Sequence, residues 1–324
     1  MTAVIFGGHG FIGSHLAREL ISSGRYDKVI SADIAPVPRF ETAGVEYMYC
    51  DVTSRIPDDL VPGAAEIYNL AAIHVTPGHQ DWEYYWTNIS GALNVTDFAR
   101  RAKVKTLFFT SSISVYGSQE SQVCEASPLN VESTYGRSKL LAEQIHKLWQ
   151  SEEPAVRRLI IVRPAAIFGY QERGNFTRLA KLLRRGAFIY PGRKDTVKAC
   201  GYVKDLVKSF EFVKERTQSL TVYNFAFDER LTTEQICDAF CEVAQLSRPK
   251  LVFPMQLILF IGWMFEFFAR IGIRTSINQA RVLKLFRSTN VTPKLLKELS
   301  FARQFNLTQA LKDWRSYSST GEFE

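Results

Sequence analysis

Tyr135 and Lys139 carry the side chains with the clearest chemistry in this sequence. Four positions separate them at the start of a stretch with helical spacing, so both side chains lie on one face of the expected helix. A tyrosine hydroxyl, with a pKa near ~10, is a poor base at neutral pH. A lysine ammonium beside it stabilises the phenolate and lowers that pKa, so the pair is suited to proton transfer.

A third candidate, Ser112, follows the apolar run at 106–111. A residue just past the carboxyl end of a strand in an open α/β sheet lies on the side where ligands bind. Its hydroxyl can therefore hydrogen-bond a reacting group. Ser112, Tyr135 and Lys139 are the candidate catalytic residues.

Gly7, Gly10 and Gly13 form a G-x-x-G-x-x-G pattern between an apolar strand and a helical segment. Glycine lets the backbone turn tightly and approach a pyrophosphate, whose charge then lies at the helix N-terminus. Asp33 ends the next expected strand, about 20 residues after Gly13. A carboxylate there accepts hydrogen bonds from the adenosine ribose and repels a 2′-phosphate, so the pattern predicts a dinucleotide and favours NAD over NADP.

The elements that must position these residues alternate along the first half of the chain. Helices are expected at 12–23, 84–103, 135–150 and 203–214. Strands are expected at 2–7, 28–33, 45–50, 66–72, 106–111, 158–163 and 221–226. Strands separated by helices imply right-handed βαβ units. The predicted class is therefore α/β, with a doubly wound parallel Rossmann sheet.

The alternation weakens after residue 165. A helical pattern covers 175–186, and a capping box at 232–235 opens another helix in a region without βαβ rhythm. The sequence therefore predicts a smaller, mainly helical C-terminal lobe for the substrate. The expected division is an NAD-binding Rossmann domain, 1–165 and 198–227, and a substrate lobe, 166–197 and 228–324.

The composition excludes several classes of protein. The 324 residues are 46% hydrophobic and 23% charged, which excludes disorder and collagen-like repeats. The net charge of +7 is spread along the chain, so a nucleic-acid partner is not expected. Five cysteines without disulfide-like spacing indicate a reducing compartment, and the first residues run directly into a strand without a leader. The cytoplasm is the expected location.

Membrane and metal binding have little support. The apolar run at 257–268 is shorter than the ~18 residues that span a bilayer, and Glu266 interrupts it. No stable span is expected, while contact with a membrane surface stays open. His74 and His79 have no carboxylate or cysteine at ligand spacing, so no metal site is expected.

Together these motifs resemble the extended short-chain dehydrogenase/reductases of the NAD-dependent nucleotide-sugar epimerase/dehydratase family. The resemblance extends over nearly the whole chain. It is carried by the glycine loop, Asp33 and the Tyr135/Lys139 pair. Further matching positions are Asp51-Val52, Leu70-Ala71-Ala72, Asn88, Ser112 before Val115-Tyr116-Gly117, and Arg163-Pro164.

The resemblance implies a cofactor, a substrate and residue roles. Tyr135 is the base and acid, Lys139 holds the nicotinamide ribose and tunes Tyr135, and Ser112 hydrogen-bonds the reacting hydroxyl. NAD would be held by Gly7, Gly10, Phe11, Ile12, Gly13, Asp33, Asp51, Val52, Leu70, Ala71, Ala72, Asn88, Tyr135 and Lys139. A nucleotide-diphosphate sugar would contact His74, Ser112, Ser114, Asn175, Arg193 and Lys198. The same analogy implies a homodimer formed by the helices at 84–103 and 135–150.

The residues before Val115-Tyr116-Gly117 narrow the reaction. Sugar 4,6-dehydratases of the family have Thr-Asp-Glu there, whereas this chain has Ser112, Ile113 and Ser114. Without that carboxylate pair, dehydration is disfavoured. A 4-epimerase acting through a transient 4-keto sugar is favoured. The alternatives are an NAD(P)-dependent 4-keto reductase or 4-dehydrogenase, a steroid- or flavonoid-type reductase, and a non-catalytic dinucleotide sensor.

Overall fold

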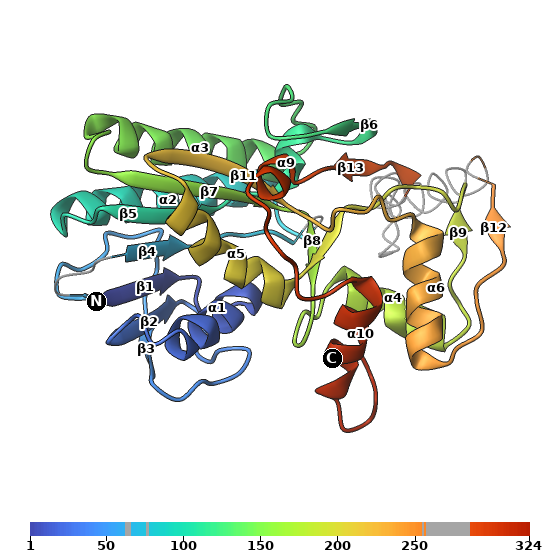
Figure 1. The fold of residues 1–324 in the computed structure, drawn as a ribbon. Coiled ribbons are helices and arrows are strands. Elements are labelled where there is room, and N and C mark those ends of the chain that lie inside the picture. Colours follow the sequence, from blue (N-terminus) through green and yellow to red (C-terminus); the bar gives the residue numbers. More distant parts are fainter. Residues whose placement is uncertain (62–65, 76–77, 255, 257–285) are drawn as a thin grey trace, which may run out of the picture.

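The computed structural model describes residues 1–61, 66–75, 78–254, 256 and 286–324. At its centre lies a seven-stranded parallel sheet, which confirms the predicted doubly wound α/β class (Figure 1). The spatial order is β11-β7-β5-β4-β1-β2-β3. The strands are β1 (Thr2–Phe6), β2 (Lys28–Asp33), β3 (Val45–Tyr49), β4 (Glu66–Asn69), β5 (Thr106–Thr110), β7 (Arg158–Pro164) and β11 (Leu220–Phe225). The strand order reverses between β1 and β4, where open α/β sheets bind ligands.

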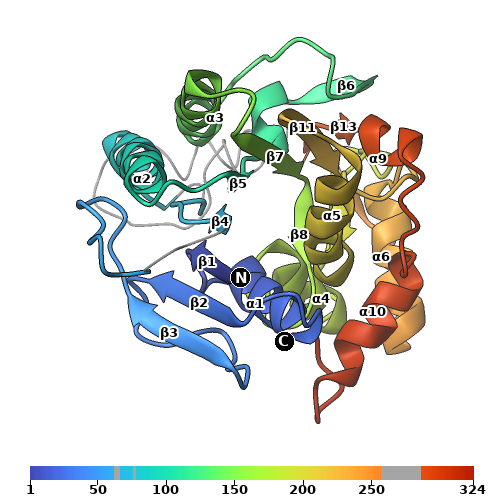
Figure 2. The ribbon, with the colours of Figure 1, turned by 60° about the vertical axis from the view of Figure 1, so that its left-hand side comes forward.

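Helices cover both faces of the sheet (Figure 2). Successive side chains of β1 point to opposite faces: Val4 and Phe6 pack with α2 and α3, whereas Ala3 and Ile5 pack with α1 and α5. Burial on both faces explains why the strands read as near-continuous apolar runs. The bounds are α1 (Phe11–Ser22), α2 (Asp81–Arg101), α3 (Thr134–Glu152) and α5 (Val203–Arg216).

A second group of elements forms the predicted lobe beside the sheet. Its core contains Phe168, Phe240 and Trp314, all fully buried. The helices are α4 (Asn175–Arg184), α6 (Thr233–Ala244) and α10 (Leu307–Ser316). As predicted, a capping box opens α6, with Thr232 and Gln235 bonding each other's backbone N–H groups. The apolar run at 257–268 lies outside the described residues.

Short strand pairs that the sequence analysis did not predict connect distant segments of the chain. All are parallel. One pair joins the residues after β7 to the segment before α5, a second joins residues 190–191 to 252–253, and a third joins residues 119–123 to 289–291. The pairs are β8 (Ala166–Phe168) with β10 (Cys200–Tyr202), β9 (Tyr190–Pro191) with β12 (Val252–Phe253), and β6 (Gln119–Val123) with β13 (Thr289–Val291).

One C-terminal segment returns to the sheet. Helix α9 (Lys294–Glu298) packs against β11, and Leu296 is fully buried in the same cluster as α1 and α5. This segment belongs to 228–324, the range that the sequence analysis assigned to the lobe. The domain division itself stays a prediction.

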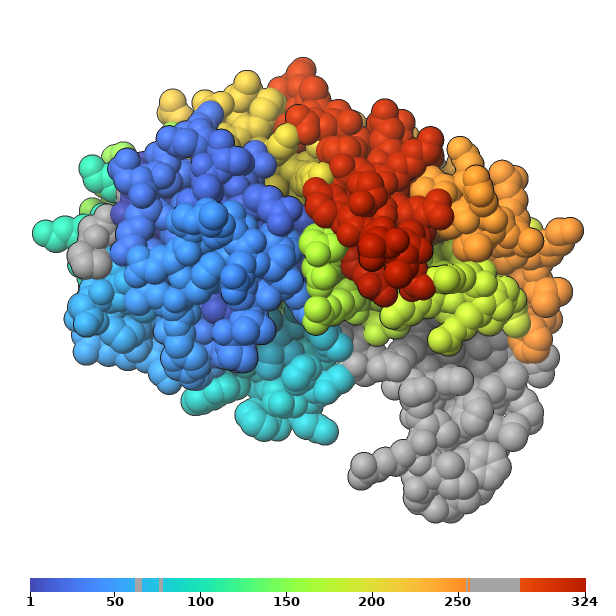
Figure 3. All heavy atoms as spheres, turned by 90° about the horizontal axis from the view of Figure 1, so that it is seen from below, coloured from blue at the N-terminus to red at the C-terminus, as the bar shows by residue number. Residues whose placement is uncertain are grey.

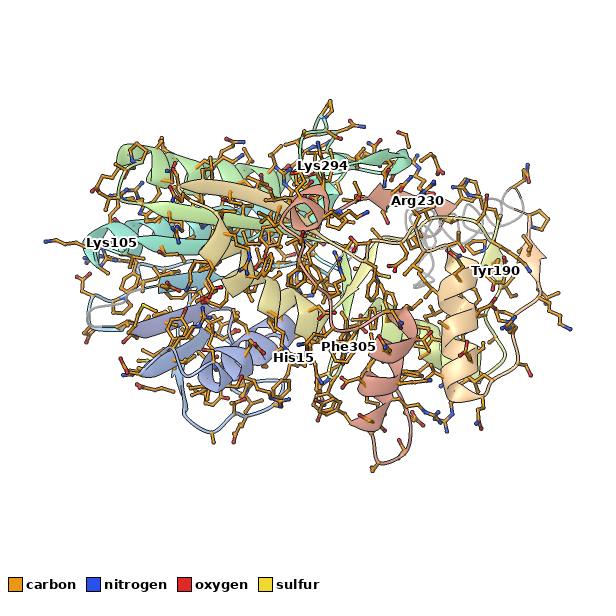
Figure 4. All side chains as sticks on the ribbon, viewed as in Figure 1. His15, Lys105, Tyr190, Arg230, Lys294 and Phe305 are labelled. Atoms are coloured by element: carbon orange, nitrogen blue, oxygen red, sulfur yellow. The ribbon has the colours of Figure 1, made fainter. Side chains whose placement is uncertain are left out.

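Side chains from the sheet region and from the lobe contact each other where the two meet. Nε2 of His15 lies 2.9 Å from the carbonyl oxygen of Tyr170, whose ring stacks on Tyr317 at 4.7 Å. Asp205 in α5 accepts the backbone N–H of Phe305 at 3.3 Å. His15 and Phe305 lie near the middle of the molecule (Figure 4), and the red C-terminal residues cover the space between the blue residues and the orange ones (Figure 3).

Among the described residues, no helix is both long enough and apolar enough to cross a bilayer. All five cysteines are free thiols. Within the same part of the chain, no group of three or more His, Cys, Asp or Glu side chains is placed to hold a metal ion.

Candidate active site

The glycine loop between β1 and α1 leaves no room for a side chain at Gly7 or Gly13. Gly7 has φ of +75°, and a Cβ there would lie 2.6 Å from the backbone nitrogen of Ala71. A Cβ on Gly13 would lie 2.5 Å from the carbonyl oxygen of Gly7. The backbone therefore passes close to both neighbours while the N-terminus of α1, at Phe11, stays open at the ligand side of the sheet. Such a cradle of glycines at a helix N-terminus fits the pyrophosphate of a dinucleotide.

Asp33 lies at the end of β2 beside this loop. Its carboxylate accepts the backbone N–H groups of His9 and Ala35, both at 3.0 Å. A carboxylate has about four acceptor positions, so it retains capacity for the ribose hydroxyls of a cofactor. This arrangement fits the predicted preference for NAD.

His9 has no predicted role but fastens the loop. The ring is 5% exposed, and its nitrogens lie 2.6 Å from the carbonyl oxygen of Ala35 and 3.2 Å from that of Ser31. This role of His9 could not be predicted from its position inside the glycine pattern, because its partners lie more than 20 positions away in the sequence. His9 therefore holds the glycine loop against the end of β2.

Other predicted cofactor residues line the same edge of the sheet or support it. Asn88 is buried in α2, where its amide bonds both backbone groups of Ile73 and, at 2.8 Å, the hydroxyl oxygen of Ser138 in α3. Asn88 thus ties the segment after β4 to the helix that carries Tyr135. Asp51 caps its own turn by accepting from Thr53.

The three candidate catalytic residues lie at the end of β5 and the start of α3. Ser112 caps the 3-10 turn η1 (Ile113–Tyr116), and its hydroxyl bonds that of Ser114. The Ser112 hydroxyl lies near that of Tyr135. Burial raises the pKa of Tyr135 to about 12, against the lowering effect of Ser112. In the protein without a cofactor, the Tyr135 hydroxyl is therefore protonated at neutral pH, and a nearby positive charge is needed before it can act as a base.

Lys139 follows one turn later on the same helix face. The side chain is 2% exposed, and its Nζ lies 4.6 Å from the centre of the Phe109 ring. Burial lowers the pKa of Lys139 to about 7, opposed by the charge of Glu143. Within the described chain, its ammonium has no hydrogen-bond acceptor, so its donors remain available to a bound ribose.

Two predicted substrate residues have partners within the protein itself, and their substrate roles stay predictions. Arg193 bonds both carboxylate oxygens of Glu120, at 2.6 and 2.7 Å, and the Ser288 hydroxyl at 3.0 Å. The Lys198 ammonium donates to the carbonyl oxygen of Arg287 at 2.6 Å. Both basic groups, predicted to close over a nucleotide, therefore hold the segment that begins at residue 286.

The remaining two candidates are exposed. Asn175 begins α4 and accepts a hydrogen bond from Arg178 at 2.9 Å, and His74 lies on the loop after β4. Their substrate roles stay predictions.

The sequence analysis missed a buried ion pair behind Lys139. Glu143 is fully buried and accepts from Nε and Nη2 of Arg163 at 2.8 and 2.7 Å. The sequence did indicate that Glu143 lies near Lys139, because the two residues are one helical turn apart. Its partner Arg163, on β7, could not be predicted from the spacing of residues along the helix.

A parallel sheet with a glycine cradle after its first strand and a Ser–Tyr–Lys set after its fifth defines a dinucleotide-dependent short-chain dehydrogenase/reductase. The model of the "NAD dependent epimerase/dehydratase family" matches residues 3–226. This chain belongs to that family and is an NAD-dependent enzyme of the extended short-chain type.

Individual relatives agree with this class. The chain is 27% identical over 314 residues to an Escherichia coli O157:H7 protein named N-acetyl-alpha-D-glucosaminyl-diphospho-ditrans,octacis-undecaprenol 4-epimerase, covering 95% of this chain and 92% of the relative. It is 29% identical over 225 residues to the UDP-glucose 4-epimerase of Yersinia pestis, covering 62% and 65%. The fold matches the Bacillus cereus UDP-glucuronic acid 4-epimerase, solved with NAD, with a TM-score of 0.76 at 19% identity over 98% of both chains.

Proposed function

We propose that this protein is an NAD-dependent 4-epimerase acting on a sugar that is joined to a diphosphate. The observation that carries the proposal is the placement of Ser112 near enough to Tyr135 to lower its pKa, with Lys139 one turn along α3, at the same edge of the sheet as the glycine cradle. Ile113 and Ser114 supply no acid–base pair, so dehydration stays disfavoured. Membership of the family and the epimerase activities named for its relatives support the reaction type.

The residues divide the chemistry between them. NAD, when bound, takes up the hydrogen of C4 as hydride and returns it. Tyr135 removes the proton of the 4-hydroxyl group while Ser112 hydrogen-bonds the same oxygen. The Lys139 ammonium favours the phenolate form of Tyr135. The resulting 4-keto sugar turns in the site, and Tyr135 reprotonates its oxygen when hydrogen returns to the opposite face.

A nucleoside diphosphate is the first candidate for the group that carries the sugar. Several relatives are named as UDP-glucose 4-epimerases, and the solved relatives include complexes with UDP-sugars. Asn175 at the start of α4 lies where the family resemblance places a diphosphate contact. This is the substrate class that the sequence predicts.

A lipid diphosphate is the second candidate, and two observations favour it. The Escherichia coli relative named for an undecaprenol-linked sugar aligns with 95% of this chain, whereas the Yersinia pestis UDP-glucose enzyme aligns with 62%. Arg193 and Lys198, predicted to bind a nucleotide, instead bond Glu120 and the Arg287 carbonyl oxygen. In sequence, the apolar run at 257–268 fits an apolar substrate better than a nucleoside.

A substrate panel separates these candidates. The purified protein with NAD is given UDP-glucose, UDP-N-acetylglucosamine, or N-acetylglucosaminyl diphosphoundecaprenol in detergent. The released sugar is then identified by NMR. We expect an epimer of one of them and none with Tyr135→Phe, which should still bind NAD. Net NADH formation without an epimer, or full activity of Tyr135→Phe, would contradict the proposal.

We also propose a cytoplasmic homodimer. On α2, Trp82 and Trp86 are 66% and 58% exposed, and on α3 Leu148 is 63% exposed. Apolar side chains on two adjacent helices fit an interface between copies of the chain. Five free thiols fit a reducing compartment. Light scattering should give a dimer mass for the wild type and a monomer mass for Trp86→Glu; a monomeric wild type would contradict the dimer.

A further inference from the structure

Glu143 is the most constrained charged group near the catalytic helix face. It lies on α3, one turn beyond Lys139, and is fully buried. One carboxylate oxygen accepts from the Ser111 hydroxyl at 2.6 Å and from Nε of Arg163 at 2.8 Å, and the other accepts from Nη2 at 2.7 Å. Three short bonds from two strands fix both oxygens, so the carboxylate cannot turn.

The partner of Glu143 is itself anchored. Nη1 of Arg163 donates to the Tyr116 hydroxyl at 2.8 Å, which donates to Oδ1 of Asn224 at 2.9 Å. Asn224 in turn donates to the carbonyl oxygen of Thr292 at 3.1 Å. A chain of buried hydrogen bonds thus runs from α3 across the sheet to the C-terminal segment. The bidentate pair with Arg163 fixes the position of the Glu143 carboxylate inside the protein.

The charge on Lys139 depends on its surroundings. Its side chain is buried, and burial disfavours an ammonium. Besides Tyr135, the titratable groups that act on it are His74 on the loop after β4, and Glu143 and His146 on α3. Burial lowers the pKa of His146 to about 3, so that ring is neutral at pH 7. Among these groups, Glu143 supplies the negative charge that favours the Lys139 ammonium. The same carboxylate also faces two positive groups, Arg163 and, at 3.8 Å, the Nζ of Lys147.

We propose that Glu143 is a positioning residue that keeps Lys139 charged and correctly placed, so that Tyr135 can act as a base near neutral pH. The inference rests on the proposed function, because it concerns the ionisation of the same tyrosine. Glu143 touches neither substrate nor cofactor. Its effect passes through Lys139, and its own position is fixed by Arg163.

Ionisation of Lys139 tests this without a substrate. Each protein is saturated with NAD and titrated with base while the lysine side chains are followed by NMR, and the signal that is absent from the matching Lys139→Met variant is assigned to Lys139. In Glu143→Gln the midpoint for Lys139 should fall by about 1 pH unit, because the carboxylate that favours its ammonium is gone. An unchanged midpoint would overturn the inference. The alkaline limb of the kcat–pH profile, where Lys139 loses its charge, should shift in the same direction.

Matched variants separate charge from packing. Glu143→Asp keeps the charge and should keep the midpoint within a few tenths of a unit, and Ser111→Ala removes one bond to Glu143 without removing charge and should do the same. A midpoint lowered in Ser111→Ala as much as in Glu143→Gln would show a packing effect and refute the proposal. If Glu143→Gln fails to fold, Arg163→Met removes the guanidinium and leaves the carboxylate, so the Lys139 midpoint should rise; an unchanged midpoint there would refute the proposal.

Failure of the proposed function gives a different result. If Tyr135→Phe retained full turnover, the epimerase assignment would be wrong whatever the titration showed. If Tyr135→Phe abolished turnover but Glu143→Gln titrated like the wild type, only the role of Glu143 would be wrong.

Discussion

Gly13→Ala tests whether the glycine loop is a cofactor cradle. A Cβ at Gly13 would lie 2.5 Å from the Gly7 carbonyl oxygen, 2.6 Å from Gly8 Cα and 2.7 Å from the Gly8 carbonyl oxygen. All three are backbone atoms, so no flexible side chain can move aside. The loop itself must shift by several tenths of an ångström, at the place where its N–H groups would meet a pyrophosphate.

The size of the effect follows from that shift. Forcing an extra methyl group into a filled space costs about 1–3 kcal/mol. If the loop must return to its original position to bind NAD, this cost appears in the affinity as a loss of about 5- to 150-fold. Gly24→Ala is the control, because Gly24 follows α1 outside the loop, its φ is +65°, and a Cβ there would meet nothing within 4 Å. Strain at that position affects folding alone, so we expect a loss of NAD affinity of less than about threefold.

Isothermal titration with NAD measures both variants, and thermal unfolding checks that each is folded. Gly13→Ala should bind NAD about 5- to 150-fold more weakly than the wild type, and Gly24→Ala less than about threefold more weakly, while both keep a cooperative transition. If the two variants bound NAD equally well, the loop would not be the pyrophosphate site, and the cofactor assignment would lose its main geometric support.

Three further outcomes are expected. Asp33→Ala should weaken NAD binding about tenfold and NADP binding far less, measured by the same titration, since NADP carries a phosphate in place of the 2′-hydroxyl that the carboxylate accepts; equal losses would show that Asp33 does not contact the ribose. Burial lowers the pKa of His15 to about 4 and that of His146 to about 3, so the unfolded chain binds more protons and the melting temperature should fall as pH drops from 7 to 4, less so in His15→Gln. Arg193→Ala should raise KM less than threefold, because its guanidinium already pairs with the half-exposed Glu120; a tenfold rise would restore the nucleotide contact predicted from sequence.

The sheet was predictable because local signals and tertiary structure agree there. All seven predicted strands form, since most of them are buried apolar runs, and the glycine pattern and Asp33 lie where spacing places them. The pairs β8–β10, β9–β12 and β6–β13 were not predictable. Strands of two to five residues carry too little periodicity, and their partners lie far along the chain.

In the candidate site, too, local relations could be predicted from the sequence and long-range contacts could not. Tyr135 and Lys139 share a helix, so their relation follows from spacing, and Ser112 follows from its place after a strand. The partners of Arg193 do not: Glu120 is 73 positions away and Ser288 is 95. A charged residue read alone looks available to a ligand, and only the folded chain shows that it is already neutralised.

The return of α9 to β11 has a consequence for how the molecule unfolds. Leu296 is fully buried against the sheet, although the chain reaches it only after passing through the lobe. The sheet therefore does not have a complete hydrophobic core without the C-terminal segment, and heating should unfold the sheet and the lobe in a single transition. Ending a recombinant chain before residue 294 would strip the outer strand of its cover and should yield an aggregation-prone product rather than an independent cofactor-binding half.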